Sequence, residues 1–183
     1  MRHRRPLGGA AAAALLICAP AFGAAVVRYD LPKIVKETEG AVAGTILEVT
    51  TSERAGEGWG PWTFTHVRIA GENLYTGESE EVVVSFLGGT FEGRTTRVPE
   101  APSPADLRIG RRVVAFHVFS PTMGGTGMTS LVGSHAGLFR LEGGPRGEIA
   151  LGRGEGYAIE RSRTLADLRS DIAEIRASAE GVR

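Results

Sequence analysis

Short apolar runs separated by glycine and proline recur along most of this chain and constrain its fold more than any other feature. The clearest run spans residues 62–74, where side chains alternate between two faces. One face carries Thr63, Thr65, Val67 and Ile69, and the other carries Phe64, His66 and Arg68. Alternation with a period of two is the pattern of a β-strand that is buried on one side. The run therefore predicts a strand with one face in a core.

Six further runs of similar composition predict strands at 41–50, 81–87, 111–119, 128–132, 138–141 and 148–151. The run at 111–119 is apolar on both faces, which predicts a central strand. Many short strands with Gly and Pro turns are typical of a mainly β protein. We therefore expect a small antiparallel β-barrel, of OB-like type, or a β-sandwich. Periodicity does not encode strand order, so both alternatives remain open.

Two segments have helical rather than alternating patterns. Residues 31–38 predict a short helix with Pro32 in its first turn, where a missing N–H is tolerated. In the tail, apolar residues step by three and four positions after Thr164, which can cap the helix. This stripe consists of Leu165, Leu168, Ile172, Ile175 and Ala179. Because so short a helix is marginal alone in water, we expect it to pack on the β-domain or to pair with another chain.

The N-terminus has the pattern of a secretory signal peptide. Three arginines among the first five residues precede an uncharged apolar run, and small residues follow it. We expect cleavage between Gly23 and Ala25, which would divide the chain into a signal peptide (1–25), a β-barrel domain (26–160) and a C-terminal helix (161–183). The single cysteine, Cys18, would leave with the signal peptide, so disulfides and cysteine–zinc sites are not expected afterwards.

Charge and hydropathy exclude two classes of partner. Removal of residues 1–25 takes away three of the 21 basic side chains and none of the 21 acidic ones, leaving a net charge of −3. Such a balance provides no general attraction for a phosphate backbone, so we expect no nucleic-acid partner. No later apolar segment is long enough to span a bilayer, so we expect a periplasmic or secreted protein with no integral membrane span.

Three stretches together resemble a known group of proteins. They are THVRI through VVVSFLGG at 65–89, LRIGRRVVAF at 107–116 and VGSHAGLFRL at 132–141. Their order resembles an uncharacterised family of exported bacterial β-domains, and it is remotely similar to netrin-like and tissue-metalloproteinase-inhibitor barrels. The resemblance implies an OB-type barrel over roughly residues 40–142. Inhibitors of that kind use an N-terminal cysteine, which the processed chain lacks, so the resemblance implies a fold and no activity.

Candidate catalytic and metal-binding residues are few. His66, His117 and His135 remain after processing, and none forms a His-x-His or His-Glu-x-x-His pair. We therefore expect no metal and no cofactor. Ser134, between glycines at 133 and 137, is one position too early for a Gly-x-Ser-x-Gly elbow. A serine-type hydrolase using Ser134 and a histidine, with Asp106 or a glutamate orienting it, remains an alternative, although we assign no catalytic residue.

Loops are the better candidates for function. The segments 88–109, 120–127 and 53–62 contain few periodic residues, and a connection as long as the first is either functional or disordered. Their aromatic, basic and flexible side chains predict a ligand-binding surface. The predicted binding residues are Trp59, Trp62, Arg94, Arg97 and Met123 from these segments, together with His135.

The sequence thus favours a non-enzymatic exported binding module that presents long loops from a small β-barrel. Its expected partner is an envelope or secreted protein. The alternatives are the Ser134 hydrolase and an envelope assembly protein that pairs through its C-terminal helix.

Overall fold

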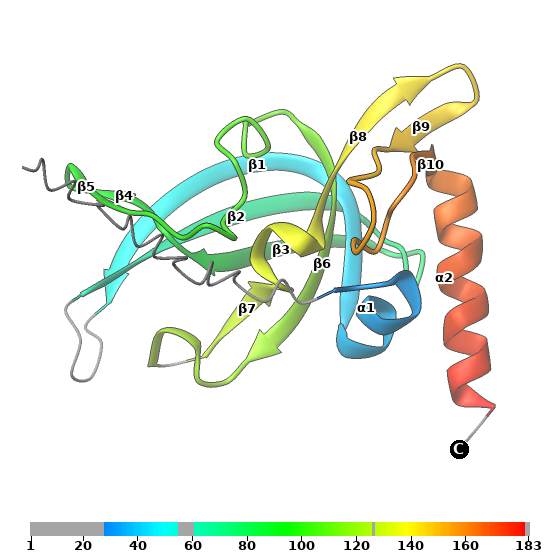
Figure 1. Ribbon diagram of the computed structural model, residues 1–183, viewed down its shortest axis with the longest axis horizontal. Coiled ribbons are helices and arrows are strands. Elements are labelled where there is room, and N and C mark those ends of the chain that lie inside the picture. Colours follow the sequence, from blue (N-terminus) through cyan, green and yellow to red (C-terminus); the bar gives the residue numbers. More distant parts are fainter. Residues whose placement is uncertain (1–27, 55–60, 126, 182–183) are drawn as a thin grey trace, which may run out of the picture.

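The computed structural model describes residues 28–54, 61–125 and 127–181. The predicted signal peptide, its cleavage position and Trp59 lie outside these residues. The two ends of the described chain are helical, and strands fill most of the part between them (Figure 1).

Five strands close into a barrel. They are β1 (Gly40–Arg54), β2 (Trp62–Asn73), β3 (Ser79–Leu87), β6 (Arg112–Ser120) and β7 (Met128–Leu131). Their order is β1-β2-β3-β7-β6, and β6 returns to pair with β1. All pairings are antiparallel except β3 with β7, which is parallel and consists of the Ser85–Ser130 bridge. Of the two predicted architectures, the barrel is therefore confirmed.

The alternation predicted for residues 62–74 places one face of β2 inside the barrel. Thr63, Thr65, Val67 and Ile69 are all buried. The barrel interior is filled by apolar side chains, most of them small or branched, from every wall strand and from the start of β8. The buried members of this inner core are Val42, Ile46, Val67, Ile69, Val84, Phe86, Val113, Ala115, Leu131 and Leu138.

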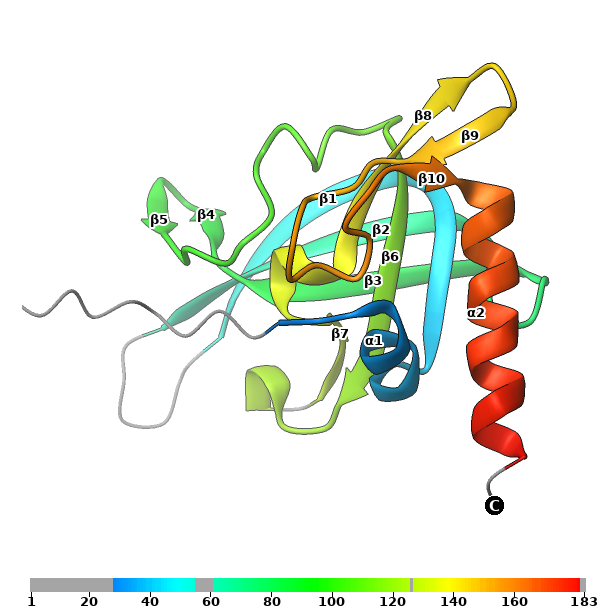
Figure 2. The same cartoon turned by 45° about the vertical axis from the view of Figure 1, so that its right-hand side comes forward.

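Three short strands extend the sheet beyond the barrel. They are β8 (Leu138–Gly144), β9 (Gly147–Ala150) and β10 (Arg163–Thr164), joined edge to edge in that order from β6 (Figure 2). The 3₁₀ turn η2 (Ser134–Gly137) leads into β8, as expected for a tight turn between two strands. Strand β6 is buried on both faces because its outward side is covered as well, which confirms that the run at 111–119 is central.

Two helices cover the outward side of β1 and β6. The helix α1 (Leu31–Glu37) packs beside α2 (Leu165–Glu180), and α2 also contacts β9 and β10. Thr164 caps α2 as the sequence predicts, because its hydroxyl accepts a hydrogen bond from the Asp167 N–H. Together these elements bury an outer core, which includes Leu31, Ile34, Val114, Phe116, Phe139, Ile159, Leu168 and Ile172.

The predicted stripe of α2 is used mainly within the chain. Leu168 and Ile172 are fully buried, and Leu165 and Ile175 pack partly against the outer core, while Ala179 is exposed. An apolar face of this kind stabilises the helix by tertiary contact. Its central residues are therefore not free to pair with another chain. Among the described residues, no helix has both the length and the apolar character that a membrane span requires.

The three predicted loops contain more regular structure than the sequence indicates. Glu53 and Arg54 continue β1 and pair with Thr63 and Trp62, so the first two residues and the last residue of the segment 53–62 belong to strands. The segment 120–127 contains the 3₁₀ turn η1 (Met123–Gly125). In the segment 88–109, β4 (Gly89–Phe91) and β5 (Arg94–Thr96) form a small hairpin that projects away from α2 (Figure 1).

Candidate binding groove

The segment 88–109 starts by crossing one end of the barrel. The Thr65 hydroxyl, from β2, donates a hydrogen bond to the Gly88 carbonyl at 2.6 Å. Gly89 follows with a φ of +128°, and a Cβ atom there would lie 2.4 Å from Thr65 Oγ1. A residue with a side chain would therefore clash at this position. Glycine lets the chain pass directly over the polar end of the barrel interior.

Beneath this segment lies a groove of about 600 Å³, which we name the loop groove. Its size falls in the range of small-molecule sites, which is about 300–1,000 Å³. Its walls come from the barrel end, from the β4–β5 hairpin and from the chain that follows. The lining residues are Thr65, Phe86, Gly89, Thr90, Thr95, Thr96, Arg97, Val98, Pro99, Ala101, Pro102, Ser103, Pro104 and Leu107. The lining is mostly apolar and carries one charged side chain, that of Arg97.

A buried carboxylate anchors the far side of the loop groove. Asp106 is 3% exposed, and its Oδ1 accepts a hydrogen bond from Arg140 Nε at 2.5 Å. Its Oδ2 accepts from Arg153 at 3.2 Å and from the Ser103 hydroxyl at 2.7 Å. Burial alone would raise the pKa of Asp106, but these hydrogen bonds and the two arginine charges outweigh it and lower the pKa. The carboxylate is therefore charged at neutral pH and ties the segment to β8 and to the chain after β9.

A second anchor joins the middle of the segment to η2. The Glu100 carbonyl accepts two hydrogen bonds from His135, one from its backbone N–H at 2.8 Å and one from Nδ1 at 2.7 Å. Since a carbonyl only accepts, Nδ1 donates this hydrogen bond, and Nε2 lies 2.8 Å from the Tyr157 hydroxyl oxygen. Arg153 connects the two anchors, because it donates to the His135 carbonyl and lies 5.8 Å from the Tyr157 ring centre.

The segment 88–109 has a defined conformation. Two anchors made of hydrogen bonds and ion pairs hold it against the barrel, and its only regular structure is the β4–β5 hairpin. A binding surface that is fixed beforehand loses less conformational entropy on binding a ligand. The loop groove is therefore a pre-formed feature of the fold.

His135 and Asp106, which a hydrolase based on Ser134 could use, are engaged in other contacts. The ring nitrogens of His135 contact Glu100 and Tyr157, and Asp106 is committed to Ser103, Arg140 and Arg153. Within the described part of the chain, no hydrogen bond joins Ser134 to a histidine. The nucleophile–base contact that a serine hydrolase needs is thus not formed by Ser134.

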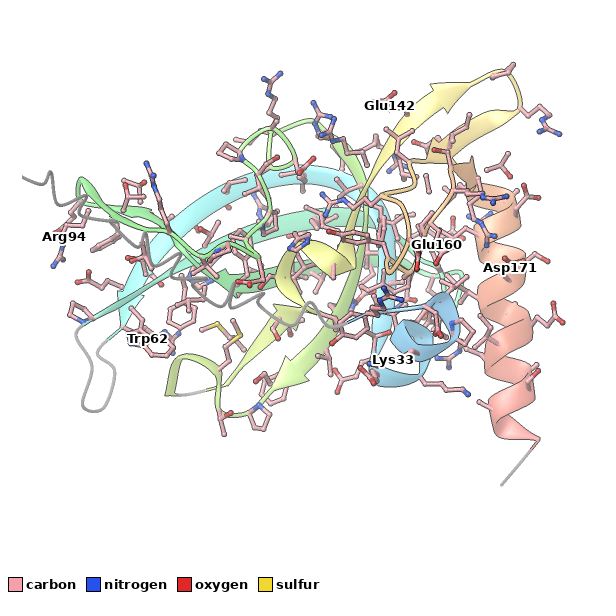
Figure 3. All side chains as sticks on the ribbon, in the orientation of Figure 1. Lys33, Trp62, Arg94, Glu142, Glu160 and Asp171 are labelled. Carbon is pink, nitrogen blue, oxygen red and sulfur yellow. The ribbon has the colours of Figure 1, made fainter. Side chains whose placement is uncertain are left out.

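The predicted binding residues do not come together in one place. Trp62 and Arg94 lie at the end of the molecule opposite α2 (Figure 3), and Arg94 is paired with Glu53 at 2.8 Å. Met123 lies in η1, and His135 is an anchor rather than a free ligand-binding side chain. Of the predicted binding residues that the structure describes, only Arg97 lines the loop groove. The anchoring roles of Asp106, Arg140, Arg153 and Tyr157 have no local sequence signal, because the partners are far apart in the chain.

His66 forms a separate polar cluster on the outer wall of the barrel. Its Nε2 lies 2.7 Å from Ser52 Oγ and its Nδ1 lies 2.8 Å from Ser85 Oγ. Burial and the nearby charge of Arg54 lower the pKa of His66. A neutral imidazole accepts one of these hydrogen bonds and donates the other. The ring therefore links strands β1, β2 and β3 and stabilises their pairing.

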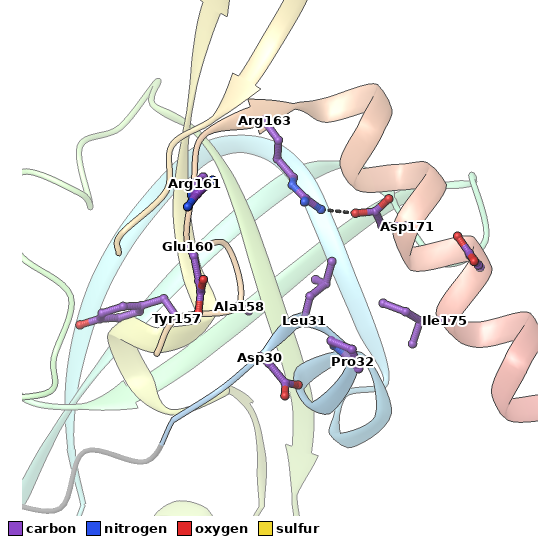
Figure 4. A pocket seen from close by; sticks show the side chains of 11 residues that line it. Asp30, Leu31, Pro32, Tyr157, Ala158, Glu160, Arg161, Arg163, Asp171 and Ile175 are labelled. Carbon is purple, nitrogen blue, oxygen red and sulfur yellow. Dashed lines mark hydrogen bonds and ion pairs between the residues drawn. The ribbon is translucent and has the colours of Figure 1, made fainter. Parts of the chain in front are cut away.

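A second groove, of about 540 Å³, lies between the start of α1, the segment 157–163 and α2 (Figure 4). Its lining differs in character from that of the loop groove, because six of the eleven lining side chains are charged. They are Asp30, Glu160, Arg161, Arg163, Asp171 and Glu174. Arg163 and Asp171 form an ion pair with each other. This second groove is therefore less suited to an apolar ligand than the loop groove is.

His117 is buried at the end of the barrel interior opposite the loop groove. It is 6% exposed, and its Nε2 lies 3.6 Å from Glu80 Oε1, while neither ring nitrogen forms a hydrogen bond within the described residues. Burial lowers the pKa of His117, and the negative charges of Glu80 and Glu39 oppose this only in part. The folded protein therefore holds this imidazole neutral at neutral pH.

We expect the stability of the protein to depend on pH through His117. The unfolded state has the ordinary histidine pKa of 6.5 and takes up a proton first as the pH falls. The free energy of unfolding should thus decrease below pH 6.5, with a slope of up to about 1.4 kcal/mol per pH unit. Urea unfolding of wild type and His117→Gln from pH 7.5 to 5 measures the difference. Parallel stability curves for the two proteins would contradict this assignment.

Comparison with protein-family models, with curated proteins and with solved structures finds no match to this chain.

Proposed function

We propose that the chain is a non-enzymatic, exported binding module whose ligand places an apolar group in the loop groove. Export rests on the predicted signal peptide, and the predicted partner is an envelope or secreted component. The observation that carries the proposal is a mostly apolar groove of about 600 Å³ under a segment fixed by two polar anchors, of which the Asp106 carboxylate is buried. Concave, pre-formed and largely apolar sites of this size are the usual sites of ligand binding.

A neutral apolar dye tests the proposal. Nile red becomes more fluorescent in an apolar environment, and we expect saturable binding to the purified protein. Thr95 is exposed on β5 and lines the groove, so Thr95→Trp should fill part of the groove and weaken dye binding about tenfold or more. Thr50→Trp is the matched control, because Thr50 is an exposed strand residue outside the groove.

The comparison has clear alternative outcomes. Equal binding by wild type, Thr95→Trp and Thr50→Trp would place the dye elsewhere and contradict the groove as the site. Absence of saturable binding to the wild type would contradict an apolar ligand. Circular dichroism and thermal unfolding of each variant show whether it is folded.

A further inference from the structure

The polar side chains that line the loop groove are, with one exception, already bound to one another or to the protein. Thr65 donates to the Gly88 carbonyl, and Ser103 donates to Asp106. Thr90 and Thr95 share a hydrogen bond of 2.9 Å, and Thr96 donates to Thr63 at 3.2 Å. A hydroxyl that is engaged in this way is less available for a ligand. The groove therefore offers a ligand fewer free hydrogen-bonding groups than its composition suggests.

Arg97 is the exception. It lines the groove, its side chain is exposed, and it has no hydrogen-bond or ion-pair partner within the described residues. Three other arginines of this region are committed, since Arg94 pairs with Glu53, while Arg140 and Arg153 pair with Asp106. A guanidinium offers five N–H donors and binds carboxylates through two parallel hydrogen bonds. An unpaired arginine beside an apolar surface suits a ligand that combines an apolar body with one anionic end.

The carboxylates of the neighbourhood do not compete for this position. Asp106 is not part of the lining and is neutralised by two arginines, and Glu53 is occupied by Arg94. The Glu100 side chain does not line the groove either, although its carbonyl anchors the segment. The lining thus has a net charge of +1, supplied by Arg97 alone.

From these contacts we propose that the ligand of the loop groove is a small apolar carboxylate, whose chain lies along the proline-rich wall and whose carboxylate binds Arg97. The proposal rests on the proposed function, since it names the class of ligand for the same groove. Arg97 contributes selectivity, because an uncharged molecule of the same length would keep the apolar contacts and lose only the charged hydrogen bonds.

Displacement of Nile red by decanoate and by decanol, at pH 7.5, tests this proposal. The two molecules have the same chain and differ in the charged end. In the wild type we expect decanoate to bind about tenfold more tightly than decanol, as expected for a partly exposed charged hydrogen bond. In Arg97→Gln the two should bind equally, with the affinity for decanol unchanged. Arg97→Lys, which keeps the charge, should retain part of the preference.

Arg94→Gln is the matched control, because Arg94 begins the strand that ends just before Arg97, is paired with Glu53 and does not line the groove. It should leave the preference for decanoate intact. Equal affinities in the wild type, or a preference that survives in Arg97→Gln, would overturn the proposed ligand class and leave the apolar groove in place. Absence of saturable Nile red binding to the wild type would instead overturn the proposed function.

Discussion

Truncation of the chain after Arg163 is expected to abolish cooperative folding. The truncation removes α2 and with it Leu168 and Ile172, which are both 0% exposed in the outer core. Removing a buried leucine or isoleucine down to alanine costs about 2–5 kcal/mol, and the whole stability of a small domain is about 5–15 kcal/mol. The loss would also uncover the apolar side of α1, where Ile34 is fully buried.

Two point variants in α2 test its contribution to stability with smaller changes. Ile172→Ala should lower the free energy of unfolding by about 2–5 kcal/mol, since it leaves a cavity between α2 and the outer core. Ser170→Ala, on the exposed side of the same helix, should change it by less than about 0.5 kcal/mol. Chemical denaturation of the wild type, the truncated chain and the two point variants measures these differences. A truncated chain that unfolds at the same midpoint as the full chain would show that α2 does not stabilise the fold.

Replacement of Asp106 by alanine is expected to destabilise the protein by about 2–3 kcal/mol and to release the segment 97–110. Breaking a buried ion pair costs about 3–5 kcal/mol, because the partner charges lose their counterion. The side chains of Arg140 and Arg153 are 40% and 22% exposed, so solvent reduces this cost. The apolar groove should widen or collapse, and Nile red binding should weaken together with stability.

Limited trypsin digestion provides a second measurement, because Arg97 and Arg108 lie within the anchored segment. Cleavage there should be slow in the wild type and fast in Asp106→Ala. Glu100→Ala is the matched control, since Glu100 lies in the same segment and contributes its carbonyl, not its carboxylate, to an anchor. Equal stability and equal cleavage of the two variants would refute the anchoring role of Asp106.

The sequence predicts most of the individual elements because local patterns encode them. The alternation of residues 62–74 puts Thr63, Thr65, Val67 and Ile69 on one face of a strand, and the structure shows that all four are buried. The tail helix begins at its predicted cap, Thr164. These features depend on neighbours within one strand or one helical turn, so periodicity and capping residues are sufficient to find them.

The arrangement of these elements could not be predicted in the same way. The return of β6 to β1, which closes the barrel, joins strands that carry no mark of their pairing. The β4–β5 hairpin has three residues in each strand, too few for an alternating pattern. The relationship to netrin-like barrels stays a prediction, since it concerns similarity to other proteins.

The candidate site was found only in part, and for a physical reason. The segment 88–109 and Arg97 stand out in the sequence by length, proline content and charge. The anchors do not, because Asp106 reaches Arg140 and Arg153 across 34 and 47 positions. The sequence also does not show that Arg94, unlike Arg97, is paired with Glu53.

The closure of the barrel has a consequence for the rate of folding. The hairpins β1–β2 and β2–β3 join near neighbours in the sequence, whereas closure brings together residues such as Ala43 and Arg112, which are 69 positions apart. Contacts between distant residues lose more chain entropy before they are made, and folding slows as their share grows. We therefore expect the β1–β2–β3 meander to form early, with barrel closure as the slow step that docking of α1 and α2 completes.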